Sequence, residues 1–321
     1  MTLRELSKLC NVSISTVSKA FSSADDISQE TKERIFEVAK KYGCYGKFYK
    51  GKYEKKVIAV ICPELSNYYI GYVEYIKNLI EKSGGVCIVS TDDFIEEKQQ
   101  ELVDYYISYL KVDGLIVLGF KGNLKKSYDT PIVSVFCSDD SSVDAVSIDL
   151  DSAIENAVSL LIDYGHEKIA FFSEKHTKYK AKHFLKTSKE LGVKNAKVFE
   201  SELRFEKAGQ DCVTQMLESG EEFSAVLCAY DNIALGAMKE FKRKRVLVPD
   251  DISVIGIDNI TMGEYSEISL TTIDTNPKEM CQIAWDLLNK KMQNKYYKSK
   301  QSIIIKANLV VRESIKKKCL R

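Results

Sequence analysis

Residues 2–21 read TLRELSKLCNVSISTVSKAF, and this stretch decides how the N-terminal part of the chain is expected to fold. Thr2 followed by Glu5 forms a capping-box pattern at the start of a first helix. Asn11, a residue type that tolerates the left-handed conformation, then interrupts the pattern. Ser13 is placed to cap a second helix over residues 13–21. The stretch therefore predicts two short helices joined by a tight turn.

A third helix is predicted over residues 29–42, with Ser28 as its cap and apolar residues spaced for one buried face. A helix-turn-helix needs a scaffold helix, a tight turn and a recognition helix with small polar residues near its start. The segment VSISTVSKAF (12–21) meets that need. A plain structural three-helix bundle is the alternative that this pattern alone leaves open.

Charge is distributed unevenly along the chain, although the formal net charge is only +1. The first 56 residues carry 12 Lys and Arg against 7 Asp and Glu, whereas the remaining 265 carry 35 against 39. A basic end on a slightly acidic body indicates a head that binds a polyanion. Five of these lysines fall in GKFYKGKYEKK (46–56), which is predicted to be a linker.

From residue 57 onward, short apolar β-rich runs alternate with helical stretches, and the alternation repeats in the second half of the chain. Near-continuous apolar strands separated by helices indicate parallel sheets covered on both faces. Strands are predicted at 57–62, 86–90, 114–119, 131–136, 145–148, 168–173, 197–201, 225–229 and 252–257. Helices are predicted near 69–83, 95–110, 151–164, 178–191, 206–219 and 231–243. Two successive sheets predict two similar lobes with a cleft, where ligands bind at the carboxyl ends of strands.

Several function classes are disfavoured by the composition. No run of about 18 apolar residues is present, so no membrane span is expected. The charged start MTLRELSKLC is unlike a secretory signal, and a cytoplasmic protein is expected. Nine cysteines occur singly without a CxxC pair, and the three histidines form no metal-binding motif. No GxGxxG or Walker A glycines follow the first strand, so neither an enzyme nor a cofactor is expected.

The chain resembles the LacI/GalR family of bacterial regulators. The resemblance begins in residues 2–43 and continues through PELSNYY (63–69), VSIDLDSAIENAVSLLIDYGHEKIAFF (146–172), AYDNIALGAMKEF (229–241), VPDDISVIGIDNI (248–260), LTTIDTNPKEM (270–280) and LVVRES (309–314). It implies a homodimer that binds a palindromic double-stranded DNA operator and changes its affinity when a small molecule enters the cleft.

Family roles carried onto this sequence imply a set of DNA contacts. Base contacts would come from Ile14, Ser15 and Lys19, with the apolar Ile14 against a thymine methyl group and Lys19 at a guanine edge. Phosphate contacts would come from Ser13, Thr16 and Ser18, while Asn11 would hold the turn.

The resemblance also implies effector contacts. Tyr68 and Tyr69 follow the first strand and are expected to line the cleft, although either could be a core residue. Asp231 is expected to bind the ligand at a helix start, with a cap as the alternative role, and Asp258 to lie beside the cleft. The family's arginine in the second lobe is replaced by Lys180, which keeps the charge but loses the bidentate fork. The histidines are expected to be structural or, for His176 and His183, exposed.

The linker is where the chain departs most from the family. Residues 46–56 lack the family's Ala-Arg-Ser-Leu hinge helix and contain two glycines and five lysines. An extended, basic linker with phosphate contacts from Lys50 and Lys52 is therefore expected in place of a wedge that bends DNA.

The sequence thus predicts an all-α helix-turn-helix head at 1–45, a hinge at 46–56 and an α/β periplasmic-binding-protein-like sensor at 57–321. By resemblance, the chain would cross between two lobes near residues 148–150, 274–276 and 298–301. Lobe one would then comprise 57–148 and 277–298, and lobe two 149–276 and 299–321. The predicted function is a DNA-binding transcription regulator, a repressor by the family's commoner role. The alternative is a periplasmic-type sugar-binding protein, against which the basic helical head argues.

Overall fold

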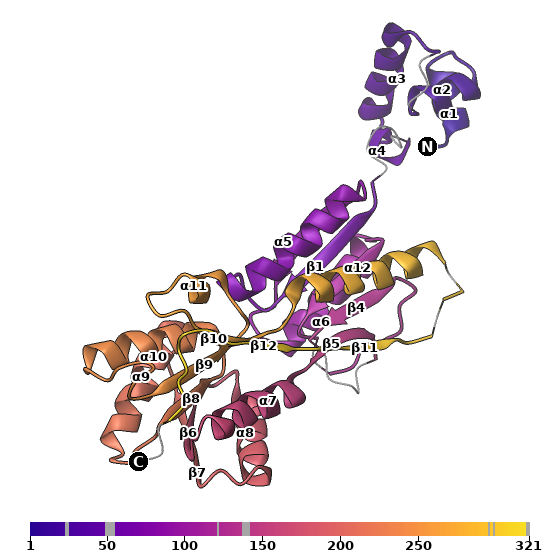
Figure 1. Cartoon of the computed structure of the whole chain (residues 1–321). Helices are drawn as coiled ribbons and strands as arrows, with labels where there is room; N and C mark the ends of the chain where they lie inside the picture. The colour runs from indigo at the N-terminus through magenta and orange to yellow at the C-terminus, as the bar shows by residue number, and fades with distance from the viewer. Residues whose placement is uncertain are drawn as a thin grey trace. The chain divides into compact units, whose positions relative to one another are not determined.

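The computed structural model describes residues 1–22, 26–48, 55–120, 122–136, 142–294, 296–297 and 299–318. The chain divides into two compact units (Figure 1). Residues 1–57 with residues 84–86 form the first unit, and residues 58–83 with residues 87–321 form the second. We call residues 1–48 the head and residues 57–321 the sensor, and each is described by itself.

The head contains three helices, α1 (Leu3–Leu9), α2 (Ile14–Ala20) and α3 (Gln29–Lys41). Each begins at a predicted cap: Thr2 and Glu5 form a capping box, and the Ser13 hydroxyl accepts from the Thr16 N–H at 2.9 Å. Ser28 accepts in the same way from Thr31. Asn11 has a φ of 49°, so the turn between α1 and α2 uses the left-handed conformation that the sequence predicted.

A short fourth helix, α4 (Tyr45–Phe48), completes the head. Its Phe48 ring lies 5.8 Å from the Phe21 ring, and its Tyr45 ring lies 5.2 Å from the Phe36 ring. Both rings pack against the core formed by Leu6 and the other buried head residues. The prediction that the linker starts at residue 46 was therefore wrong for residues 46–48, because the aromatic contacts hold them on the head. Residues 49–54 lie outside the described residues.

The sensor contains two six-stranded sheets. The first has the spatial order β11 (Ser302–Lys306), β5 (Asp144–Asp149), β4 (Ile132–Val135), β3 (Gly114–Leu118), β1 (Val57–Cys62) and β2 (Val86–Thr91). The second has the order β12 (Asn308–Val310), β10 (Thr271–Asp274), β9 (Ser253–Ile257), β8 (Ala225–Cys228), β6 (Lys168–Glu174) and β7 (Asn195–Ser201). The two sheets thus repeat one doubly wound order, with a switch point beside β1 and another beside β6.

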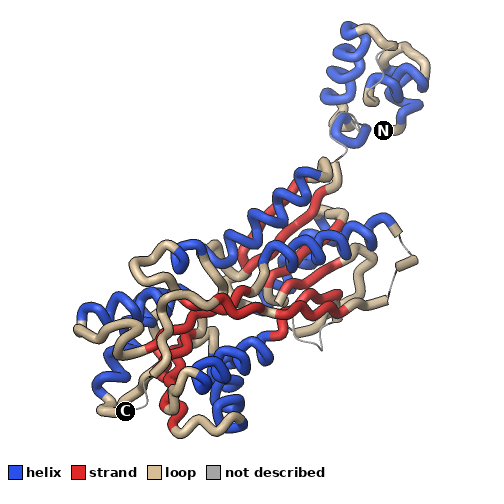
Figure 2. The backbone as a smooth tube through the Cα atoms, in the orientation of Figure 1, coloured by secondary structure: helices blue, strands red, loops and turns tan. Residues whose placement is uncertain are grey.

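Helices flank the strands of both sheets (Figure 2). Lobe one carries α5 (Asn67–Lys82), α6 (Glu96–Asp104) and α12 (Pro277–Gln293), and α6 continues as a π-helix over Tyr105–Tyr109, where the sequence predicted one uniform helix. Lobe two carries α7 (Leu150–Asp163), α8 (Lys178–Glu190), α9 (Phe205–Glu218), α10 (Asp231–Arg243) and the short α11 (Thr261–Glu264). Each lobe has its own apolar core, and the strands supply fully buried side chains to both cores.

The chain passes between the lobes three times. The first two passages, from β5 to α7 and from β10 to α12, fall where the sequence predicted them, near residues 148–150 and 274–276. The third prediction, at residues 298–301, was wrong: β11 pairs with β5 in the first sheet, so the chain crosses at Ala307. Ile305 of β11 is buried in the core of lobe one, which explains this placement.

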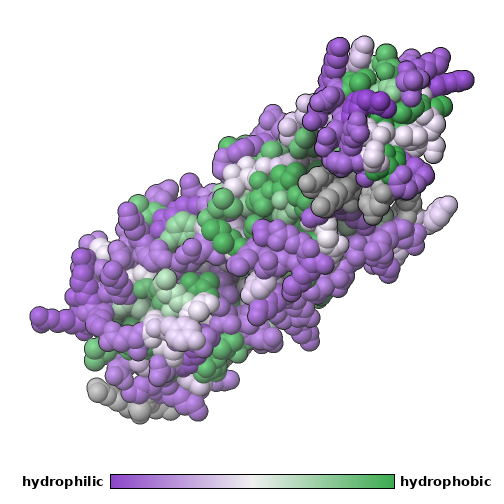
Figure 3. All heavy atoms as spheres, turned by 90° about the horizontal axis from the view of Figure 1, so that it is seen from above, coloured by the Kyte–Doolittle hydropathy of each residue, from purple (hydrophilic) through white to green (hydrophobic). Residues whose placement is uncertain are grey.

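The face of the molecule seen in Figure 3 is mostly hydrophilic, with hydrophobic side chains gathered in separate patches. Exposed apolar residues of lobe one include Ile70 on α5 and Val89 on the edge strand β2, with exposed fractions of 43% and 37%. Within the described part of the chain, no helix combines the length and apolar character needed to cross a membrane.

Candidate functional site

The first candidate site is the exposed face of α2. Val17 and Ala20 point into the head core, and this orientation leaves the other side of the helix in solvent. The predicted base-contact residues share that side: Ile14 is 46% exposed, and Ser15 and Lys19 are exposed. Ile14 is thus an exposed apolar residue on the same side of α2 as Ser15 and Lys19.

The residues predicted to hold phosphate lie at the start of the same helix. The Ser13 hydroxyl lies 2.7 Å from the Thr16 hydroxyl and caps the helix, whose N-terminus attracts anions. Ser18 is exposed one turn later. Lys19 forms an ion pair with Asp26, but both side chains are about half exposed, and such surface pairs are weak and easily exchanged. The predicted Lys50 and Lys52 lie outside the described residues.

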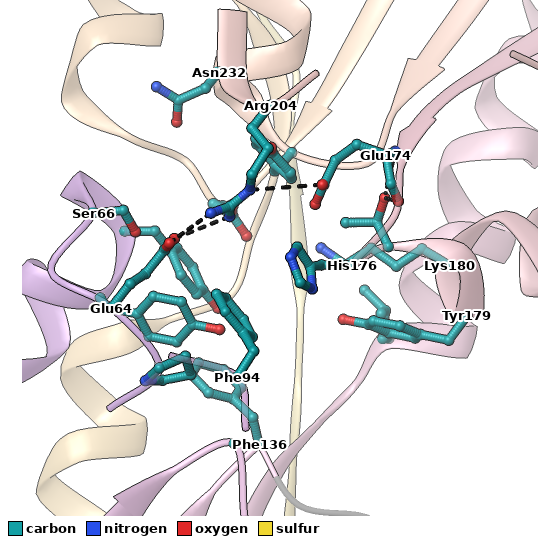
Figure 4. A pocket seen from close by; sticks show the side chains of 18 of the residues that line it. Glu64, Ser66, Phe94, Phe136, Glu174, His176, Tyr179, Lys180, Arg204 and Asn232 are labelled. Carbon is teal, nitrogen blue, oxygen red and sulfur yellow. Dashed lines mark hydrogen bonds and ion pairs between the residues drawn. The ribbon is translucent and has the colours of Figure 1, made fainter. Parts of the chain in front are cut away.

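The second candidate site is a cavity of about 650 Å³ that residues of both lobes line (Figure 4). Almost every strand near it contributes the residues at its carboxyl end. Glu64 follows β1, Phe94 follows β2, Phe136 follows β4, Glu174 ends β6 and Arg204 follows β7. This is the position at which ligands bind doubly wound sheets.

Aromatic side chains form much of the cavity wall. They are Tyr68, Tyr69, Phe94, Phe120, Phe136, Tyr179, Phe205 and Tyr230. Tyr68 and Tyr69 pack edge to face with ring centroids 5.0 Å apart, and Phe94 of lobe one stacks on His176 of lobe two at 4.2 Å. Flat apolar walls of this kind bury the face of a ring or a sugar.

One arginine joins the two lobes across the cavity. Arg204 donates from Nη1 to Glu64 Oε2 at 2.6 Å and from Nη2 to Glu64 Oε1 at 3.0 Å. Its Nε lies 3.7 Å from Glu174 Oε2, on the opposite side from Glu64 (Figure 4). The guanidinium also lies over the Phe205 ring, 4.5 Å from the ring centre. Paired, planar contacts of this type hold a guanidinium in a fixed orientation.

Burial and charge set the protonation of the cavity's carboxyl groups. Burial raises the pKa of Asp258 to about 7, against an opposing effect of Lys180. Burial also raises the pKa of Glu174, which Arg204 only partly offsets. Burial would raise the pKa of Glu64 too, but the hydrogen bonds from Arg204 and its positive charge bring that pKa below its usual value. The cavity therefore holds one firmly ionised carboxylate and two whose charge responds to their surroundings.

Four of the five predicted effector residues line the cavity: Tyr68, Tyr69, Lys180 and Asp258. Lys180 is 8% exposed and donates from Nζ to the Ala229 carbonyl at 2.7 Å. Asp231 does not line it, and the prediction of a ligand contact was wrong for this residue. Its carboxylate is fully buried, accepting from the Thr272 hydroxyl at 2.6 Å and from the Ile260 N–H at 2.8 Å. The alternative prediction of a cap was also wrong, since Tyr230 is the N-cap residue of α10.

Four residues of the cavity wall were not predicted from the sequence: Glu64, Phe94, Glu174 and Arg204. His176 and His183 were predicted to be exposed, but both line the cavity. A signal was available, because Glu64, Phe94 and Arg204 come within a few residues of the end of a predicted strand and Glu174 is the first residue after one. His166 is structural as expected, with its ring nitrogens bonded to the Ser224 hydroxyl and the Lys316 carbonyl. Within the described ranges, no group of three or more His, Cys, Asp or Glu is arranged to hold a metal ion.

Comparison with known proteins gives a match for each of two parts of the chain. Residues 2–45 match the family of bacterial regulatory proteins named after lacI, and residues 158–315 match the periplasmic binding protein-like domain. The chain belongs to the LacI family of bacterial regulators. It is accordingly a DNA-binding transcription regulator with an effector-binding domain.

Relatives of this LacI-family chain match it over nearly its full length. The transcriptional repressor CytR of Escherichia coli is 27% identical, covering 98% of this chain and 96% of its own. Catabolite control protein A of Priestia megaterium is 26% identical, covering 91% and 92%. Among solved structures, the lac repressor dimer bound to operator and an anti-inducer has a TM-score of 0.77 at 22% identity, covering 98% and 99%. These relatives are regulators rather than enzymes.

Proposed function

We propose that this chain is a cytoplasmic, non-enzymatic repressor that binds a palindromic operator as a homodimer and is controlled by a small molecule in the sensor cavity. The observation that carries the DNA-binding part is the exposed face of α2. Ile14, Ser15 and Lys19 extend from it while Val17 anchors the opposite side. The first turns of a recognition helix contact base edges in the major groove, so these residues would read the operator sequence.

Repression and dimerisation are proposed from the relatives. CytR carries the name of a repressor, and the lac repressor structure is a dimer on its operator. A palindromic operator requires two heads, and two-fold dimers bind such sites with matching symmetry. Val89 on the edge strand β2 is an exposed apolar residue of lobe one, and the proposed contact between two copies includes this edge.

The effector part of the proposal rests on the cavity. Its volume of about 650 Å³ suits a molecule the size of a sugar or nucleoside, and both lobes line it. A ligand that contacts Tyr68 and Tyr69 from one lobe and Lys180 and Asp258 from the other would bind one relative placement of the lobes best. Such differential binding is what changes a regulator's affinity for DNA.

Substitution of Lys19 tests the DNA contact. With the promoter region beside the chain's own gene as probe, Lys19→Ala should weaken binding by about 1–3 kcal/mol and relax selection at one operator position. Lys41→Ala, at the exposed end of α3, is the matched control for loss of one positive charge. Fluorescence anisotropy on operator variants measures both. Equal, sequence-independent weakening by the two variants would contradict base reading by Lys19.

A further inference from the structure

The charged groups of the cavity are not equally available to a ligand. Three carboxylates, from Glu64, Glu174 and Asp258, line it together with two cations, Lys180 and Arg204. Both cations already have protein acceptors: Glu64 takes both terminal nitrogens of Arg204, and the Ala229 carbonyl accepts from Lys180. The carboxylates thus outnumber the cations. The group best suited to bind an anion, the Arg204 guanidinium, is already bonded to Glu64.

Glu174 has capacity that the protein does not use. The side chain is 1% exposed, yet its Oε2 atom has no hydrogen-bond partner. Arg204 Nε, the neighbouring donor, also lacks a hydrogen bond and remains 3.7 Å away. Buried polar atoms are nearly always hydrogen-bonded, because an unsatisfied one loses its hydration without replacement. An acceptor left open in a cavity wall points to a donor that arrives with the ligand.

Glu64 makes the cavity unfavourable for anions. A ligand carboxylate or phosphate would have to displace the Glu64 carboxylate, which holds Arg204 by two short hydrogen bonds and is tethered to the same molecule. It would also approach Glu174 and Asp258, which would repel it whenever they are ionised. A hydroxyl or a protonated amine meets neither obstacle.

We propose that the effector is a non-anionic molecule with a flat face that donates a hydrogen bond to Glu174 from a hydroxyl or protonated amine, and that Glu64 determines this specificity by occupying Arg204. The flat face lies against aromatic side chains of the cavity wall. This inference rests on the proposed role of the cavity as the effector site. It adds the charge class of the ligand and names the residue that enforces it.

The experiment compares ligands that share a skeleton and differ in charge. Thermal shift and calorimetry on the full chain would use tyramine, tyrosol and 4-hydroxyphenylacetate, then glucosamine, glucose and glucose 6-phosphate, and nucleosides with their 5′-monophosphates. Binding is expected from cationic or neutral members and not from their anionic counterparts. If the group that donates to Glu174 is an amine, the cationic ligands should bind most tightly. If it is a hydroxyl, the neutral ligands should bind as tightly as the cationic ones or more tightly.

Two variants then test the named residues with the molecule that binds. Glu174→Gln should weaken it by about tenfold, because the amide oxygen can still accept but a charge-assisted hydrogen bond becomes a neutral one. Glu167→Gln, at an exposed ion pair with Lys194 on the surface of lobe two, is the matched control and should bind like the original chain. Glu64→Gln releases Arg204, so the anionic counterpart should gain at least about tenfold in affinity.

The outcomes separate this inference from the function on which it rests. Preferential binding of an anionic member, unchanged affinity in Glu174→Gln, or no gain of anion binding in Glu64→Gln would each overturn the charge-class inference while leaving an effector site in place. No binding by any member of the three series would overturn both the inference and the proposed effector role of the cavity.

Discussion

At the scale of single residues, Asp231 and Asp258 are two carboxylates of the second lobe with different roles. The Asp231 carboxylate joins strand β10 to the segment that follows β9. One of its oxygens accepts from the Thr272 hydroxyl in β10, and the other accepts from the Ile260 N–H after β9. It occupies the space above Gly256, where a Cβ atom would lie 2.0 Å from Oδ1. Asp258, with a φ of 112°, instead lines the cavity. Both residue types were predictable as site candidates, but the direction of each side chain depends on which neighbours fill the space beside it.

The buried position of Asp231 predicts a pH dependence of stability. Burial, chiefly, and the nearby Asp258 raise the pKa of Asp231 to about 8 in the fold, whereas an unfolded chain gives about 3.9. Because its pKa is higher in the fold than in the unfolded chain, this carboxyl contributes its full stabilisation below about pH 4. The contribution falls as the pH rises above about 4 and is lost once the pH passes about 8.

We therefore expect the original chain to lose stability relative to Asp231→Asn by up to about 1.4 kcal/mol per pH unit between about pH 4 and 8. Asparagine can keep both hydrogen bonds, since its oxygen can accept from Ile260 and its amide can donate to Thr272. Urea unfolding at a series of pH values measures the difference. Asp250→Asn, at an exposed ion pair with Lys316, is the control. A difference that stays constant with pH would contradict the assignment.

At the scale of elements, the closest packing joins α9 and α10. A Cβ atom at Gly209 would lie 2.0 Å from the Ile233 carbonyl oxygen, and one at Gly236 would lie 2.0 Å from the Glu206 carbonyl oxygen. Only glycine allows the two backbones to approach so closely. The contact matters for the cavity because α9 begins at Phe205, next to Arg204, and α10 begins directly after Tyr230.

Gly236→Ala should destabilise the sensor by about 2–3 kcal/mol or more, because the clash is with backbone and the helices must separate. Gly71→Ala in α5 is the control, since an added Cβ atom there meets nothing within 4 Å. Alanine favours a helix over glycine by up to about 1 kcal/mol, so this control should be neutral or stabilising. Chemical denaturation measures the free energy of unfolding of both variants. Similar values for the two would refute the packing argument.

Most elements could be predicted from local sequence. The run VIAVIC predicted a strand over the same residues as β1, and the Thr2, Ser13 and Ser28 caps placed the three head helices. The π-helix after Asp104 and the membership of β11 in the first sheet could not be predicted. The first depends on a local change of hydrogen bonding, and the second on pairing with β5, which lies far away in the sequence. The inter-lobe pair of Glu64 and Arg204 joins residues 140 positions apart, and no local pattern reports such a contact.

At the scale of the whole molecule, we propose that the connection between head and sensor determines how strongly DNA binding depends on salt. Phe48 packs in the head, so Phe48→Ala is expected to destabilise the head. Lys50 and Lys52 remain the proposed phosphate contacts of the connection. Each phosphate contact contributes about 0.9 to the slope of log affinity against log salt concentration.

The double variant Lys50→Ala with Lys52→Ala should thus flatten that slope by about 2 and weaken operator binding at low salt. Anisotropy titrations at several salt concentrations measure the slope. The double variant Lys55→Ala with Lys56→Ala removes two lysines from the same basic segment and is the matched comparison. If removing Lys50 and Lys52 left the slope unchanged, these two lysines would not contact phosphate.

The return of the chain to the first sheet at β11 has a consequence for biosynthesis. Strands β1 to β5 leave the ribosome early, but α12 and β11, which complete the core of lobe one, are made only after all of lobe two except β12 and the final residues. Lobe two can therefore reach most of its native contacts while lobe one still exposes the apolar surface that Trp285, Leu288 and Ile305 will cover. Domains usually fold in the order of their synthesis. Here the N-terminal lobe is completed last, so a nascent or C-terminally truncated chain exposes lobe one to aggregation and to chaperones.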